Sequence, residues 1–168
     1  RINSVRSTRK ITNAMKMVSA AKLRKAQDAI LSLRPYDAQL YKVLCYINEQ
    51  TDDWVNIYAE ERPKRRILLI LIASNRGLCG PFNANVVKDA QHLINDKYKH
   101  FYKTGMLDIV VIGKKAEEQL KARGYPIKAT YHDIFDHATY EDVGEIVQKY
   151  MDDFYNEHYD QIQLIYNR

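Results

Sequence analysis

The sequence predicts an α/β protein in which a long, protruding N-terminal coiled-coil helix precedes a Rossmann-like, mainly parallel sheet. The first observation is that no glycine precedes Gly77, while residues of high helix propensity dominate the first third of the chain. The second is the continuous apolar run 67–73, which is typical of a strand buried on both faces. The third is the alternation of strand-like and helix-like segments after that run, the pattern of a parallel α/β sheet.

The N-terminal helix is predicted to run from Ile2 to about Ile57, which gives a length of about 80 Å at 1.5 Å per residue. Pro35 is expected to kink this helix without ending it, because one apolar seam continues in phase on both sides. The seam has alternating spacings of three and four residues, as in a coiled coil, with Asp37 as its polar position. Its apolar members are Leu23, Ala26, Ile30, Leu33, Leu40, Leu44 and Ile47.

The chain is therefore divided into a helical segment, 1–58, and a Rossmann-like domain, 59–168. Within the domain, Asn83 is expected to cap the first helix and Thr139 the last, with Asp142 in the capping-box position. The expected strands are 67–73, 108–112, 127–131 and 161–166, and the expected helices are 84–103, 114–123 and a last helix ending near His158.

Positive charge is concentrated in the first part of the chain. Residues 1–34 contain nine Lys or Arg and one acidic residue, Asp28, for a net charge of +8, whereas residues 35–168 carry a net charge of −3. A basic segment of this kind is expected to meet an acidic partner surface. A solvated helix face explains the same pattern and stays open as the simpler interpretation.

Features of a catalytic, metal or cofactor site are weak in this sequence. The loop 74–83 follows the first strand, where α/β folds bind ligands, but it lacks both the G-x-G-x-x-G and the G-K-[ST] patterns. Pro81 also removes a backbone donor that a bound phosphate needs. The histidines lack metal-ligand spacing, and Cys45 and Cys79 are expected to be reduced thiols. We therefore expect no metal and no cofactor, and no apolar run is long enough to cross a bilayer.

Two other functions stay open at this point. The basic segment followed by an apolar seam superficially resembles a basic leucine zipper, which makes a nucleic-acid-binding module the main alternative. The other is a small α/β enzyme with Cys79 as nucleophile, since a helix N-terminus favours the thiolate. Against it, the residues next to Cys79 in the sequence include no histidine or acid that could act as a base.

Two motifs resemble those of a known family. Residues 11–27 (ITNAMKMVSAAKLRKAQ) resemble the N-terminal signature of the gamma subunits of F-type ATP synthases, and Arg34-Pro35-Tyr36 recurs there as well. Residues 76–83 are similar to the family motif Arg-Gly-Leu-Cys-Gly-Gly-Phe-Asn and depart from it at Pro81. The matching loop residues are Arg76, Gly77, Leu78, Cys79, Gly80, Phe82 and Asn83.

The resemblance implies a non-catalytic rotor subunit, the central stalk of the proton-translocating F-type ATP synthase, which couples hydrogen-ion transport to ATP synthesis. The implied partners are the alpha, beta and epsilon subunits and the c-ring, with no nucleic acid. The implied location is peripheral, on the cytoplasmic face of the bacterial inner membrane or its mitochondrial or chloroplast counterpart. In the family, a long C-terminal helix pairs antiparallel with the N-terminal one. The residues expected to contact alpha and beta are Arg6, Arg9, Lys10, Met15, Lys16, Lys22, Arg24 and Lys25.

Overall fold

A computed structural model of the 168-residue chain describes residues 1–50, 57–59, 61–135 and 139–167. The chain divides into two compact units, Arg1–Asn56 and Ile57–Arg168. The first unit contains the long helix, and the second contains the sheet and the remaining helices.

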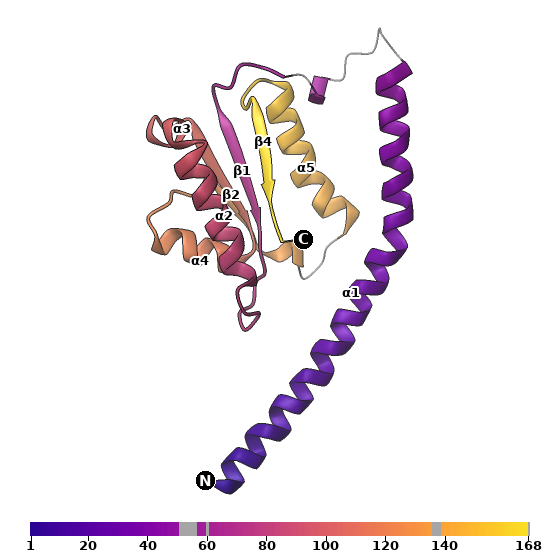
Figure 1. Cartoon of the computed structure of the whole chain (residues 1–168), viewed down its shortest axis with the longest axis vertical. Helices are drawn as coiled ribbons and strands as arrows, with labels where there is room; N and C mark the ends of the chain where they lie inside the picture. The colour runs from indigo at the N-terminus through magenta and orange to yellow at the C-terminus, as the bar shows by residue number, and fades with distance from the viewer. Residues whose placement is uncertain (51–56, 60, 136–138, 168) are drawn as a thin grey trace. The chain divides into compact units, whose positions relative to one another are not determined.

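Helix α1 (Ile2–Gln50) is a single α-helix of 49 residues that continues through Pro35. Figure 1 shows that it bends part-way along its length. At 1.5 Å per residue it is about 74 Å long. The predicted stretch 51–56 lies outside the described residues, and Ile57 belongs to a separate 3₁₀ turn, η1 (Ile57–Ala59).

The sheet has four strands in the order β3-β2-β1-β4, and every neighbouring pair is parallel. This arrangement confirms the predicted α/β class with a parallel sheet. The third strand begins at Ala129, two residues later than predicted, and the Lys128 backbone N–H donates to the Ile109 carbonyl just before it. The strands are β1 (Ile67–Ile72), β2 (Leu107–Ile112), β3 (Ala129–Tyr131) and β4 (Gln161–Ile165).

Helices cover both faces of the sheet (Figure 1). Side chains of Leu69 and Leu71 pack on one face with α2 and α4, while Leu68 and Ile70 pack on the other with Tyr150 of α5. Successive residues of a strand point to opposite faces, so a strand covered on both sides must be apolar throughout. The helices are α2 (Phe82–Asp96), α3 (Lys99–Lys103), α4 (Lys114–Ala122) and α5 (Tyr140–Tyr155).

The prediction of one continuous helix over 84–103 is wrong. The structure has two helices there, because α2 ends at Asp96 and α3 begins at Lys99. Tyr98 adopts φ −114° at the break, and its backbone N–H donates to the Leu93 carbonyl, five residues earlier. The ring is 1% exposed, and its hydroxyl donates to Gln163 on β4 (2.8 Å). The break therefore goes together with burial of this tyrosine in the core.

One predicted cap is confirmed and one is wrong. The Thr139 hydroxyl accepts the backbone N–H of Asp142 (3.1 Å), as the capping-box pattern predicts. Helix α2 begins earlier than predicted, with Pro81 at the N-cap and Asn83 inside the first turn. The Asn83 side chain is used by the preceding loop instead. At the other end of the domain, α5 stops before His158 because Glu157 takes a positive φ of 59°, which a helix does not allow.

Four side chains form a charged network at the amino ends of the strands. Asp108 on β2 accepts hydrogen bonds from Tyr159 (2.7 Å), Lys128 (2.9 Å) and Arg66 (3.1 Å). Lys128 also donates to the Tyr159 hydroxyl (2.6 Å). Burial opposes ionisation of Asp108, but the hydrogen bonds from Lys128 and Tyr159 outweigh it and lower the pKa of this carboxyl. The network ties together the starts of β1, β2, β3 and β4.

Replacing Asp108 by asparagine is expected to lower the free energy of unfolding by about 2 kcal/mol at pH 7, since it leaves two cations and a buried hydroxyl poorly paired. Because folding lowers the Asp108 pKa, its contribution is present above the unfolded pKa of about 3.9 and disappears as the pH falls through the folded value. The variant should therefore lose less stability than the wild type between about pH 4 and 2. Urea unfolding of both proteins across this pH range measures the difference in their stabilities. Amide exchange in β1 and β2 is the readout. Exposed Asp89, replaced by asparagine, is the control and should change the result little.

Candidate functional site

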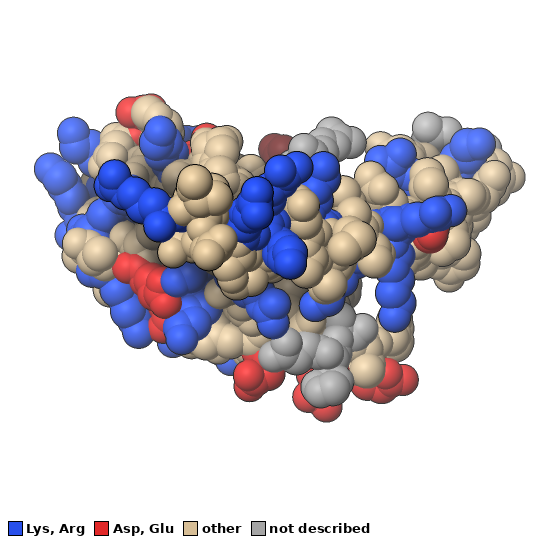
Figure 2. Space-filling model, turned by 90° about the horizontal axis from the view of Figure 1, so that it is seen from below, with Lys and Arg blue, Asp and Glu red and all other residues tan. Residues whose placement is uncertain are grey.

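The basic residues of α1 all lie on its solvent-exposed surface. The eight residues expected to contact partners are exposed, and Met15 is 54% exposed. Within the described part of the chain, none of the seven Lys or Arg among them takes part in a salt bridge. Lys and Arg (blue) cover much more of the face seen in Figure 2 than Asp and Glu (red). These cations are therefore available to a partner.

The cations of α1 surround the helix and do not share one side. At 100° per residue, Arg6 and Arg24 lie on one side, whereas Lys22 and Lys25 lie at other angles around the axis. A basic leucine zipper needs its cations turned toward one groove of DNA. The arrangement therefore counts against a basic leucine zipper.

The predicted apolar seam is exposed over most of its length. Leu23, Ala26, Ile30, Leu33, Leu40 and Leu44 are exposed, and Ile47 is half-buried. An uncovered apolar stripe on a soluble helix marks a surface that binds another protein segment. The alternating spacing of three and four residues is the pattern that a second helix covers in a coiled coil.

The second candidate surface is the loop 74–83 after β1, which is organised by Asn83. This side chain is 4% exposed, and its oxygen accepts a hydrogen bond from the Ser74 backbone N–H (2.9 Å) and lies 3.0 Å from the Ser74 hydroxyl. Its amide nitrogen donates to the Arg76 carbonyl (3.2 Å) and lies 3.2 Å from the Cys79 sulfur. One buried amide thus fixes both sides of the loop.

Asn75 braces the same loop against the next strands, and no sequence motif singled it out. Its side chain donates to the His132 carbonyl after β3 (2.8 Å) and accepts the Lys114 backbone N–H at the start of α4 (2.9 Å). Gly113 was also not predicted, although it lies where β2 meets α4 with a φ of +111°. The sequence did contain a signal for Asn75 and Gly113, since each follows shortly after a buried strand. Polar residues and glycines in such positions meet at one edge of a parallel sheet.

The surroundings of Cys79 do not suit a catalytic thiol. The sulfur is exposed, and its neighbours are the Asn83 amide at 3.2 Å and the Arg76 carbonyl at 3.9 Å. Neither an amide nor a carbonyl can accept a proton as a general base. This geometry counts against the small-enzyme alternative.

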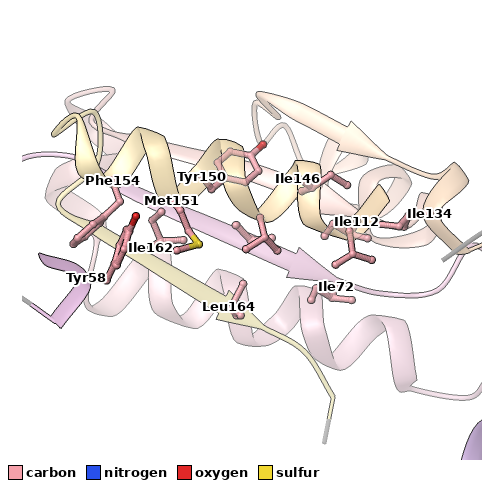
Figure 3. Close-up of a pocket in the computed structure, with 13 residues that line it drawn as sticks. Tyr58, Ile72, Ile112, Ile134, Ile146, Tyr150, Met151, Phe154, Ile162 and Leu164 are labelled. Carbon is pink, nitrogen blue, oxygen red and sulfur yellow. The ribbon is translucent and has the colours of Figure 1, made fainter. Parts of the chain in front are cut away.

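An apolar cavity of about 430 Å³ lies between α5 and the sheet (Figure 3). Its lining is mainly aliphatic, from residues such as Ile72, Ile112, Ile162 and Met151, and the Tyr150 hydroxyl lies 3.1 Å from that of Tyr131. Burial, together with that hydrogen bond, raises the Tyr150 pKa, so the phenol stays neutral. Among the described residues that line it, the cavity therefore has no converging set of polar groups like that of an active site.

The chain is similar to known proteins along its whole length. A family profile described as ATP synthase matches residues 1–168, the whole chain. Curated relatives are named ATP synthase gamma chain. The chain belongs to the ATP synthase gamma-chain family. The relative from Cytophaga hutchinsonii is 42% identical over 168 residues, and that from Amoebophilus asiaticus is 44% identical over 168 residues, each match covering 99% of this chain.

The chain spans only part of these gamma chains. The match covers 57% of the length of both relatives, and likewise 57% of the relative from Christiangramia forsetii, which is 43% identical. Membership in the family confirms the resemblance drawn from residues 11–27 and 76–83, and it gives no support to a nucleic-acid-binding module. None of the helices in the described ranges has the length and apolar character to span a membrane.

Proposed function

We propose that this protein is the central-stalk rotor subunit of an F-type ATP synthase, with segment 1–58 as part of the stalk and domain 59–168 as its foot. The observation that supports this most is α1 itself. It is a 49-residue helix whose cations and apolar seam are exposed together. A stalk inside a ring of subunits needs both features. The apolar seam pairs with another helix along one side of the stalk, and the cations on its other sides contact the ring.

The rotor works by favouring one conformation of each ring subunit over another. Moving a two-state equilibrium from 1:99 to 99:1 requires a difference of about 5.5 kcal/mol in favour of one state. Single screened surface charges contribute roughly 1 kcal/mol or less, so several contacts must act together. The seven exposed cations and Met15 supply such a set. A glycine-free helix transmits the torque because it resists local unwinding.

The remaining features of the proposal concern location and partners. Alpha and beta are proposed to contact the basic part of α1, and epsilon and the c-ring to contact the foot. The protein is then peripheral to the membrane, on the cytoplasmic face in a bacterium. ATP chemistry takes place on the partner subunits, so the rotor itself is non-catalytic. The family and the gamma-chain relatives support these assignments.

Co-purification tests the proposal against the nucleic-acid alternative. The protein, carrying an affinity tag, is expected to bring alpha and beta subunits with it in a stable complex. Its affinity for duplex DNA should be weak and independent of DNA sequence, as for non-specific electrostatic binding by a basic surface. Recovery without alpha and beta, together with tight DNA binding that falls steeply with salt concentration, would overturn the proposal.

A further inference from the structure

The apolar cavity between α5 and the sheet has the size and lining to hold an aliphatic chain. Its volume of about 430 Å³ lies within the range of small-molecule sites, roughly 300–1,000 Å³. Isoleucine, valine, leucine and methionine side chains form most of its wall (Figure 3). Val147 and Leu164 line the cavity and are also exposed, so it is open to solvent on one side. A ligand can therefore enter without unfolding of the core.

A second, polar cavity adjoins the apolar one near the carboxyl end of α5. It has a volume of about 320 Å³ and shares Tyr58, Phe154 and Ile162 with the apolar cavity. Figure 3 shows Tyr58 and Phe154 together at one end of the apolar cavity, and their ring centroids are 6.2 Å apart. An apolar space and a charged space thus meet at these residues. The other residues that line the polar cavity are Glu61, Arg62, Lys64, Asp160 and Gln161.

Arg62 is the buried cation of the polar cavity. Its side chain is 13% exposed, and its guanidinium carbon lies 4.3 Å from the centre of the Phe154 ring. One amino group donates to the Phe154 carbonyl (2.8 Å), which fixes the guanidinium beside the end of α5. The Glu157 carboxylate is 3.9 Å away on an exposed side chain, so this ion pair is weak.

The Nε atom of Arg62 is buried and has no hydrogen-bond partner among the described residues. It is a donor, so an acceptor is required to complete its bonding. Asp160 lines the same cavity, but one of its carboxylate oxygens already accepts the backbone N–H groups of Arg65 and Arg66 (2.8 Å each). An anionic head group that enters this cavity therefore finds a positioned cation with an unused donor.

We propose that the two cavities together bind a fatty-acid anion, with its chain in the apolar cavity and its carboxylate on Arg62. A carboxylate forms strong, charge-assisted hydrogen bonds with a guanidinium group. A neutral hydrophobic molecule would fill the apolar cavity but leave the Arg62 donor unpaired. The site is built entirely within the sheet domain, so the proposal does not depend on the rotor function.

Two amphiphiles with the same chain and opposite head groups test the site. Decanoate and decyltrimethylammonium are titrated separately into the protein, below the concentrations at which they form micelles, and calorimetry measures each affinity. Decanoate is expected to bind at one site at least about tenfold more tightly, because only its head group pairs with Arg62. Equal affinities, or no saturable binding of decanoate, would overturn the proposal.

Arg62→Gln tests the role of the cation. This variant removes the charge, so the two affinities should come within about twofold of each other. Arg123→Gln is the matched control, because it removes an arginine that is exposed and contacts only Gln119 among the described residues. It should leave the preference for decanoate unchanged. Amide exchange in α5 checks that both variants are folded, and a full preference for decanoate in folded Arg62→Gln would refute the role of Arg62.

Photo-labelling of the unaltered protein locates the chain without any variant. Decanoate with a diazirine at the end of its chain is expected to label cavity residues of α5 and β4, such as Met151 and Leu164, and excess decanoate should prevent this. Labels confined to the apolar seam of α1 would show non-specific binding and overturn the proposal. Absence of label in α5 and β4, as when a protein segment fills the cavity, would also overturn it. No partner subunit is used, so either failure leaves the rotor function to be judged by co-purification.

Discussion

Replacing Gly113 by alanine is expected to lower the free energy of unfolding of the sheet domain by about 3 kcal/mol or more, the sum of backbone strain and steric overlap. Gly113 has φ +111° and ψ 131°, which residues other than glycine essentially never adopt. A Cβ there would lie 2.0 Å from the Ala73 carbonyl oxygen and 2.7 Å from its carbon. Neither backbone atom can move without breaking the hydrogen bond from Ala73 to the Ile112 carbonyl (2.9 Å). The ends of β1 and β2 would have to separate.

The matched control for this variant is Gly124→Ala. Gly124 also has a positive φ, +78°, but a Cβ there would meet no atom within 4 Å. Its replacement should cost only the backbone strain, about 1 kcal/mol. Urea unfolding with amide exchange in β1 and β2 as the readout gives both values. Equal losses for the two glycines would show that the close approach of Ala73 is not what requires Gly113.

The second large effect is expected in the assembled enzyme from Met15→Lys. Met15 lies within residues 11–27, the N-terminal signature, and a flexible thioether suits the proposed surface that meets changing partners. In the contact proposed for Met15, a lysine would bury a charge that has no partner, at a cost of several kcal/mol. We expect ATP hydrolysis to continue while ion-driven ATP synthesis falls at least about tenfold, equivalent to 1.4 kcal/mol. The ratio of the two rates in reconstituted vesicles measures coupling.

Met17→Lys is the control for Met15→Lys. Met17 is 70% exposed and lies about 160° around the helix from Met15, so the same charge is added on another side of α1. Coupling should stay closer to the wild-type value in this variant. Coupling that is unchanged in Met15→Lys, or lost equally in both variants, would count against a specific role for Met15.

Features set by local patterns could be predicted from the sequence. The run Ile67–Ile72 had to be a strand covered on both faces, because every side chain in it is apolar. The long helix followed from the absence of glycine and the phase of the seam on both sides of Pro35. The Thr139 cap was also predictable, since its partner Asp142 lies three residues away.

Features that depend on distant contacts could not be predicted in the same way. The break at Tyr98 accompanies a hydrogen bond to Gln163, which is 65 residues further along the chain. Asn83 was expected to cap α2, but it bonds to Ser74 because the loop folds back on the helix start. The network around Asp108 joins residues from four separate segments. Asn75 braces the loop through His132 and the start of α4, which are 57 and 39 residues away in the sequence.

Single-molecule rotation tests the central claim most directly. Alpha and beta subunits are immobilised with this protein in place, and a bead is attached to the domain 59–168. With ATP supplied, the bead is expected to turn in one direction in discrete steps. The stepping rate should increase with ATP concentration. ATP hydrolysis by the same complex with a bead that only fluctuates about a fixed angle would contradict the assignment of this chain as the rotor.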